Sequence, residues 1–148
     1  MGTDLRRPRN NTVFDISNDE GLSTYLIGNC EYDTVIQPTP LKNLFYAVSG
    51  PVPPNPAELI ESERMKLFIE KAKKEFDIII IDTPPVAIVS DALLLAEYVD
   101  VNVFVVRQRY SSKNTLDLIE EYYQAGTLKN IGILVNDISL SGYYGYGI

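Results

Sequence analysis

Residues Asp77–Pro85 read DIIIIDTPP, four isoleucines followed by an aspartate, a threonine and two prolines. Four consecutive β-branched isoleucines predict a short strand buried on both faces, as in a parallel sheet covered by helices. Pro84 and Pro85 end the strand because neither can donate an N–H to a neighbour. Asp82 is therefore expected at the carboxyl end of a core strand, where open α/β sheets bind their ligands. The alternative role for this carboxylate is a structural salt bridge.

The segments that follow alternate between helix and strand patterns. Helices are expected over residues 91–98, with Ser90 as the cap, and from Ser112 to Tyr123, closed by Gly126. Strands are expected over residues 101–107 and 131–136. Strands and helices that alternate with short joints indicate a parallel sheet with right-handed crossovers. The expected fold class is therefore α/β, a parallel sheet flanked by helices.

The preceding half of the chain has weaker signals. GLSTYLIG is typical of one or two helical turns that end at Gly28, and residues 33–38 and 43–50 are expected to be extended. The clearest helix start is Asn55, with Pro56 at the first position and Glu58 placed as in a capping box. Apolar residues then recur at helical spacing: Met65, Phe68, Ile69, Ala72 and Phe76.

Composition excludes several kinds of function. The 148 residues suit one domain with a real core, and residues 1–138 are expected to form it. A net charge of −7 argues against a nucleic-acid partner. The lack of histidine excludes Ser-His-Asp and Cys-His catalysis and most zinc sites. The single cysteine, Cys30, cannot form an internal disulfide, and no membrane span or signal peptide is evident.

Charged residues near the start form a second candidate group. Asp4 and Arg6 lie with Arg7 and Arg9 in the opening segment. Such a segment can simply be a solvated terminus. Paired with Asp82, however, Asp4 would give two carboxylates at neighbouring strand ends, an arrangement that suits Mg²⁺ beside phosphates. Arginines there would face anionic oxygens.

The last ten residues differ in composition from the rest. Tyr143, Tyr144 and Tyr146 alternate with Gly145 and Gly147 beyond the last expected strand. Structural tyrosines bury their rings, so this spacing is poor for a core. Residues 139–148 are expected to be a flexible tail whose hydroxyls can enter another site. A sticky disordered tail without that role is the alternative.

Five segments, in order, resemble the bacterial tyrosine kinases of capsule and exopolysaccharide synthesis, which are P-loop ATPases. IIIIDTPP resembles their Walker B segment, and TDLRRP resembles their second acidic motif, Asp-x-Asp-x-Arg-x-Pro. GLSTYLIG and GPVPPNPAELIES are similar to their connecting segments, and LSGYYGYGI is similar to their terminal tyrosine cluster. The resemblance runs from Asp4 almost to Ile148. It implies a P-loop NTPase-like sheet, represented here by the C-terminal part of the kinase domain.

The resemblance also implies roles for individual residues. Asp82 would act on Mg²⁺, and Asp4 would lie near the metal and the attacking tyrosyl oxygen. Arg6 would help to organise the phosphate site. Asn136 would contact the adenine of ATP, although an asparagine after a strand is equally typical of a turn or a helix cap. Three residues would accept the phosphoryl group: Tyr143, Tyr144 and Tyr146.

The reaction implied for the complete protein is transfer of the ATP γ-phosphoryl group to its own tyrosine cluster. This would regulate polysaccharide synthesis and export. The implied partners are a membrane-embedded polysaccharide co-polymerase or activator and further copies of the same chain. The implied location is the cytoplasmic face of the bacterial plasma membrane.

The chain departs from the family pattern in two ways. No Gly-x-x-x-x-Gly-Lys-Ser/Thr loop, which would cradle the nucleotide phosphates, occurs in it. Gly2 stands where the pattern has its first acidic residue. These 148 residues alone are therefore expected to lack kinase activity. Two alternatives stay open: a non-catalytic regulatory or scaffold module, and a relative of the partitioning and cell-division ATPases.

Overall fold

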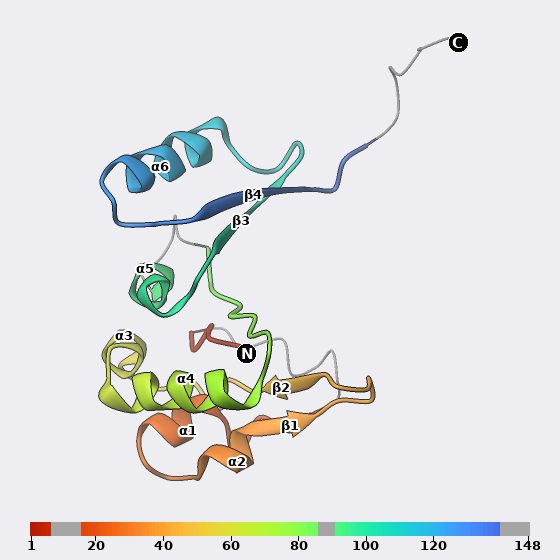
Figure 1. The fold of residues 1–148 in the computed structure, drawn as a ribbon, viewed down its shortest axis with the longest axis vertical. Coiled ribbons are helices and arrows are strands. Elements are labelled where there is room, and N and C mark those ends of the chain that lie inside the picture. The colour runs from red at the N-terminus through yellow and green to blue at the C-terminus, as the bar shows by residue number, and fades with distance from the viewer. Residues whose placement is uncertain (7–15, 86–90, 140–148) are drawn as a thin grey trace. The chain divides into compact units, whose positions relative to one another are not determined.

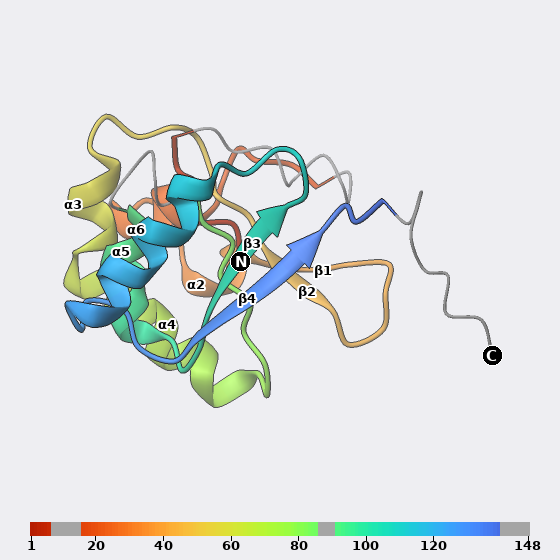
Figure 2. The same cartoon turned by 90° about the horizontal axis from the view of Figure 1, so that it is seen from above.

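The computed structural model describes residues 1–6, 16–85 and 91–139. It divides into two compact units, Met1–Tyr98 and Val99–Ile148. Both units combine helices with strands, so the α/β class expected from the sequence is confirmed (Figures 1 and 2). None of the helices in the described ranges is long and apolar enough to span a membrane.

The first unit consists of short helices around one hairpin. α1 (Leu22–Leu26) and α2 (Tyr32–Val35) precede the antiparallel strands β1 (Ile36–Pro38) and β2 (Phe45–Ala47). The hairpin is followed by α3 (Pro56–Ile60), α4 (Glu63–Glu75), α5 (Asp91–Leu95) and a 3₁₀ turn over Ala96–Tyr98. The expectation of extended chain over residues 33–38 is wrong in its first half, which forms the end of α2.

α4 supplies the centre of the core. The Ser62 hydroxyl caps the helix by accepting a hydrogen bond from the Met65 N–H at 3.3 Å. The Tyr32 ring packs on Phe68 with 4.9 Å between the ring centroids. Helical spacing correctly predicted the buried positions of α4, which are Met65, Phe68, Ile69 and Ala72.

The chain around the predicted helix start divides into two helices. Asn55 is the N-cap of α3 and Pro56 is its first residue, as predicted. The Asn55 side chain does not bond to the main chain, however, but donates from Nδ2 to Glu58 Oε2 at 2.6 Å. α3 ends before Ser62, because that hydroxyl donates to the Leu59 carbonyl and starts α4.

The isoleucine run is not a strand buried on both faces, and that prediction is wrong. Its only ladder contact among the described residues is an isolated parallel bridge between Gly2 and Asp82. Ile79 and Ile81 pack against the core, but the side chains of Ile78 and Ile80 are 81% and 75% exposed. Among the described residues, side chains pack against only one face of this segment.

The second unit is a strand–helix–strand unit, as predicted. β3 (Asn102–Arg107) and β4 (Ile131–Asn136) pair in parallel, with Phe104 opposite Ile133, and α6 (Lys113–Gln124) connects them. Gly126 follows α6 with φ +67°, a conformation that favours glycine at a helix end. Figure 2 shows the two strands running side by side.

Candidate functional site

The opening residues lie beside the end of the isoleucine segment. The Asp82 N–H donates to the Met1 carbonyl at 2.9 Å, and the Thr3 N–H donates to the Asp82 carbonyl at 2.9 Å. The Thr3 hydroxyl donates to the same carbonyl at 2.6 Å. These bonds bring the chain at Asp4 next to the chain at Asp82, as two neighbouring strand ends would.

The two carboxylates have different surroundings. Asp82 is exposed, whereas Asp4 is half-buried and accepts the Arg6 N–H at 3.1 Å through Oδ1. Within the described ranges, no three His, Cys, Asp or Glu side chains gather into a group that could hold a metal. A pair of carboxylates fits Mg²⁺, which is usually bound by one or two carboxylates together with substrate phosphates and waters.

Arg6 is held by a carboxylate that the sequence did not point to. Its Nε donates to Asp91 Oδ2 at 2.7 Å and its Nη2 donates to Asp91 Oδ1 at 2.9 Å. Asp91, the first residue of α5, is fully buried. The hydrogen bonds and charge of Asp91 raise the pKa of Arg6. A guanidinium has five N–H donors, so this two-pronged pairing leaves others for an anionic oxygen.

Asn136 belongs to the second unit, at the end of β4. Its Oδ1 accepts the Asp137 N–H at 2.8 Å, a local bond of the kind that the turn alternative predicts. Opposite it, at the end of β3, Arg107 donates from Nε to Asp137 Oδ2 at 2.8 Å. The carboxyl ends of these parallel strands thus present an ion pair that sequence analysis missed. A strand-terminal arginine was the only available signal.

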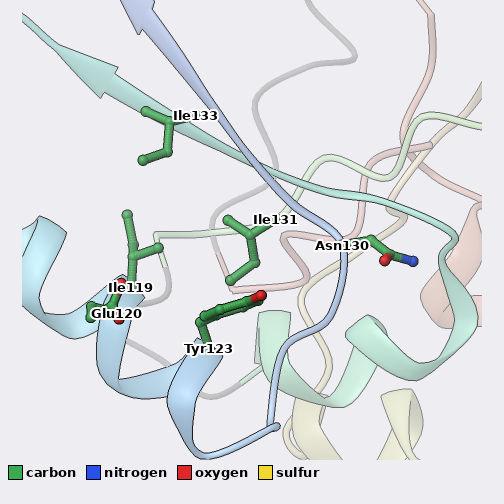
Figure 3. A pocket seen from close by; sticks show the side chains of 6 residues that line it. All are labelled: Ile119, Glu120, Tyr123, Asn130, Ile131 and Ile133. Carbon is green, nitrogen blue, oxygen red and sulfur yellow. The ribbon is translucent and has the colours of Figure 1, made fainter.

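A hollow of about 390 Å³ lies between α6 and β4 (Figure 3). Its lining is mainly apolar, with one carboxylate, and comprises Ile119, Glu120, Tyr123, Asn130, Ile131 and Ile133. It contains none of the predicted site residues.

The chain matches known proteins along almost its whole length. It is 35% identical over 150 residues to the tyrosine-protein kinase YwqD of Bacillus subtilis, a match that covers 98% of this chain and 63% of YwqD. It is 37% identical over 146 residues to the tyrosine-protein kinase ptk of Acinetobacter johnsonii, covering 97% of this chain and 20% of that one.

The chain is homologous to bacterial tyrosine kinases. The solved kinase domain of the Escherichia coli tyrosine kinase ETK is 33% identical, with a TM-score of 0.87. The match covers 99% of this chain and 58% of the ETK chain. The crystal structure of the chimerical protein CapA2B2 is also 33% identical, with a TM-score of 0.86. That match covers 93% of this chain and 61% of the CapA2B2 chain. The chain thus spans less than two thirds of these relatives. No family model matches it.

Gly2 departs from the acidic pattern of the bacterial tyrosine kinases, and its surroundings give a physical reason. A Cβ atom on Gly2 would lie 2.6 Å from the Tyr46 hydroxyl oxygen and 2.7 Å from Ser49 Oγ. Both neighbouring side chains are buried. An acidic side chain at this position would therefore require Tyr46 and Ser49 to move.

The ionisation of Tyr46, which lies beside Gly2, is expected to make the stability of the chain depend on pH. Burial, and then the charge of Asp82, raise the pKa of Tyr46 above 10.0. Above pH 10 the unfolded chain therefore loses this proton while the folded chain keeps it, so stability should fall as pH rises through that range. We expect Tyr46→Phe to reduce this fall, as measured by urea unfolding between pH 8 and 11. An unchanged slope would show that Tyr46 does not contribute.

The remaining predicted site residues, Tyr143, Tyr144 and Tyr146, lie outside the described residues. So do Arg7, Arg9 and the expected helix cap Ser90.

Proposed function

We propose that the chain is part of a bacterial tyrosine kinase domain that transfers the ATP γ-phosphoryl group to tyrosines of a terminal cluster. The observation that carries the proposal is the match of 97–98% of the chain to two tyrosine kinases. The hydrogen bonds from Thr3 to the Asp82 carbonyl add support, because Asp4 follows Thr3 directly in the chain.

The proposed roles of Asp82, Asp4 and Arg6 follow from the chemistry of their side chains. ATP supplies the phosphoryl group when bound, and Mg²⁺ neutralises charge on the phosphate oxygens. Asp82 and Asp4 are the proposed Mg²⁺ ligands, directly or through water. Asp4 also receives or orients the proton of the attacking tyrosyl hydroxyl. Arg6, held in one orientation by Asp91, directs its remaining N–H groups at phosphate oxygens.

The other proposed residues lie elsewhere. Asn136 contacts adenine, and the acceptor tyrosines belong to the tail of residues 139–148, with residues 1–138 as the folded domain. Each phosphate added to the tail brings close to two negative charges, which would repel an acidic neighbouring surface. This charge provides a physical means of regulating assembly.

The biological setting is proposed from the same resemblance. The complete protein would regulate capsular or exopolysaccharide synthesis and export from the cytoplasmic face of the plasma membrane. Its partners would be a membrane-embedded polysaccharide co-polymerase or activator and other copies of itself.

A second candidate function is a non-catalytic regulatory or scaffold module. One observation favours it for these 148 residues: they contain no Gly-x-x-x-x-Gly-Lys-Ser/Thr loop. Most of the energy for holding nucleotide phosphates comes from that loop. A module of this kind would still accept phosphate on its tail.

The proposal is tested by phosphorylation in trans. We expect full-length YwqD, incubated with this chain, ATP and Mg²⁺, to place phosphate on the tail tyrosines, as mapped by mass spectrometry. Replacing all three with phenylalanine should remove at least nine tenths of the label. The residues concerned are Tyr143, Tyr144 and Tyr146.

Exposed tyrosines elsewhere provide the matched control. Tyr110 and Tyr123 are 81% and 56% exposed, so the double variant Tyr110→Phe/Tyr123→Phe should keep the label. Label that is absent from the tail, or equally strong at Tyr110, would contradict the acceptor role.

A further inference from the structure

The backbone of Gly2 lies between two neighbouring segments of the first unit. Its N–H donates to the carbonyl of Ala47 in β2 at 3.0 Å, and on its other side it forms the parallel bridge to Asp82. Residues paired across a parallel bridge carry their side chains on the same face. A side chain at position 2 would therefore stand beside the carboxylate of Asp82.

Two hydroxyl groups fill the space that such a side chain would need. A Cβ on Gly2 would lie 2.6 Å from the Tyr46 hydroxyl oxygen and 2.7 Å from Ser49 Oγ, whereas the next atom, Cζ of the Tyr46 ring, is 3.5 Å away. A separation of 3.5 Å is an ordinary van der Waals contact, but the two shorter ones are not. The two oxygens, and not the ring or the backbone, therefore exclude a side chain at position 2.

These hydroxyl groups are held in place and lie within the field of Asp82. Tyr46 and Ser49 are 8% and 4% exposed, and the Ser49 hydroxyl donates to the Gly2 carbonyl at 3.1 Å. Burial raises the pKa of Tyr46, and the charge of Asp82 raises it further. The phenol is therefore uncharged at neutral pH, as is the serine hydroxyl. The space beside Asp82 thus holds neutral oxygens in place of a carboxylate.

The number of carboxylates at a cation site affects how tightly the site binds a free ion. Gly2 stands where the acidic pattern of the bacterial tyrosine kinases has its first acidic residue, so Asp4 and Asp82 are the carboxylates that remain. In the described part of the chain, no three acidic, histidine or cysteine side chains form a potential metal group. A pair of carboxylates usually holds Mg²⁺ together with phosphate oxygens.

We propose that the hydroxyl groups of Tyr46 and Ser49 determine the cation affinity of this site by keeping a third carboxylate away from Asp82. A free divalent cation then binds weakly, and phosphate oxygens complete its ligand set. The site thereby favours a cation that arrives already bound to phosphate. This inference rests on the metal role given to Asp82 and Asp4 in the proposed function.

The test measures binding of Mn²⁺ alone, by electron paramagnetic resonance and without nucleotide. The triple variant Gly2→Asp/Tyr46→Phe/Ser49→Ala adds the carboxylate and removes both crowding oxygens. We expect it to bind Mn²⁺ at least tenfold more tightly than the wild-type chain. Near-ultraviolet circular dichroism, with and without Mn²⁺, reports whether the variant is folded, because a bound ion stabilises the folded chain.

Three controls locate the effect. Asparagine in place of aspartate at position 2 of the triple variant has nearly the same shape without the charge, and it should give no gain. Gly132→Asp adds one carboxylate in β4, where a Cβ would meet nothing within 4 Å, and should also give none. Adding Asp82→Asn to the triple variant should remove the gain, because the ion would lose its neighbouring ligand.

The single variant Gly2→Asp tests the role of the hydroxyl groups themselves. With Tyr46 and Ser49 unchanged, we expect a lower urea midpoint than for the wild-type chain and less than half of the logarithmic gain in Mn²⁺ affinity. Wild-type stability together with the full gain would overturn the proposal, since the hydroxyls would then exclude nothing.

Two further results would also overturn it. One is a folded triple variant that binds Mn²⁺ no more tightly than the wild-type chain, which would leave Tyr46 and Ser49 with a packing role alone. The other is a triple variant that stays unfolded in millimolar Mn²⁺. A failed tail-phosphorylation experiment would contradict the kinase function but would not alter these results, because neither nucleotide nor the tail takes part in them.

Discussion

Replacing Gly2 with alanine is expected to lower the free energy of unfolding by about 1–3 kcal/mol, the usual cost of overpacking a filled site. The added Cβ would lie 2.6 Å from the Tyr46 hydroxyl oxygen and 2.7 Å from Ser49 Oγ. Gly2 cannot easily shift away, because its N–H donates to Ala47 and its carbonyl accepts the Ser49 hydroxyl at 3.1 Å. Urea unfolding measures the loss.

A matched glycine and a compensating variant sharpen this test. A Cβ on Gly132 in β4 would meet nothing within 4 Å, so Gly132→Ala should be close to neutral. Tyr46→Phe removes one of the two crowded oxygens and should recover part of the loss caused by Gly2→Ala. Equal stability of the two alanine variants would show that the space around Gly2 accommodates a side chain.

The second large effect is expected at Asp91. Asp91→Asn should lower the free energy of unfolding by about 2 kcal/mol, because it weakens two charge-assisted hydrogen bonds to Arg6 at a fully buried site. Arg6→Met should destabilise more, since it leaves a buried carboxylate without its cation. The double variant Arg6→Met/Asp91→Leu should recover much of that loss. Urea unfolding of the wild-type chain, Arg6→Met, Asp91→Leu and the double variant completes the double-mutant cycle.

A surface ion pair provides the control. Lys71 Nζ lies 3.0 Å from Asp33 Oδ1, and these side chains are 45% and 87% exposed. Asp33→Asn should therefore change stability by less than about 1 kcal/mol. If Asp91→Asn cost no more than Asp33→Asn, the buried pair would not hold the opening segment in place.

Local patterns in the sequence predicted local structure well. β3, α6 and β4 each carry their own periodicity and end signals, and they form at the expected positions. The helical spacing of Met65 and Phe68 likewise predicted burial. These features depend on neighbours within a few residues, so a single sequence contains the necessary information.

Features that depend on distant partners could not be predicted in this way. The isoleucine run indicated two-sided burial, but the described residues cover one face, since burial depends on what packs there. The sequence predicts Asp91 only as the first residue of a helix over residues 91–98, because no periodicity reveals a partner 85 positions away at Arg6. The crowding of Gly2 by Tyr46 likewise arises only after the chain folds back on itself.

The separation along the chain of these contacts has a consequence for synthesis. The first unit is closed by bonds between Thr3 and Asp82 and between Arg6 and Asp91, which are 79 and 85 positions apart. In the second unit, Arg107 and Asp137 are 30 positions apart. During synthesis, the first residues cannot form these contacts until Asp91 has left the ribosome. Until then, apolar side chains of the first unit stay exposed to solvent. The later unit can close soon after its last strand is made.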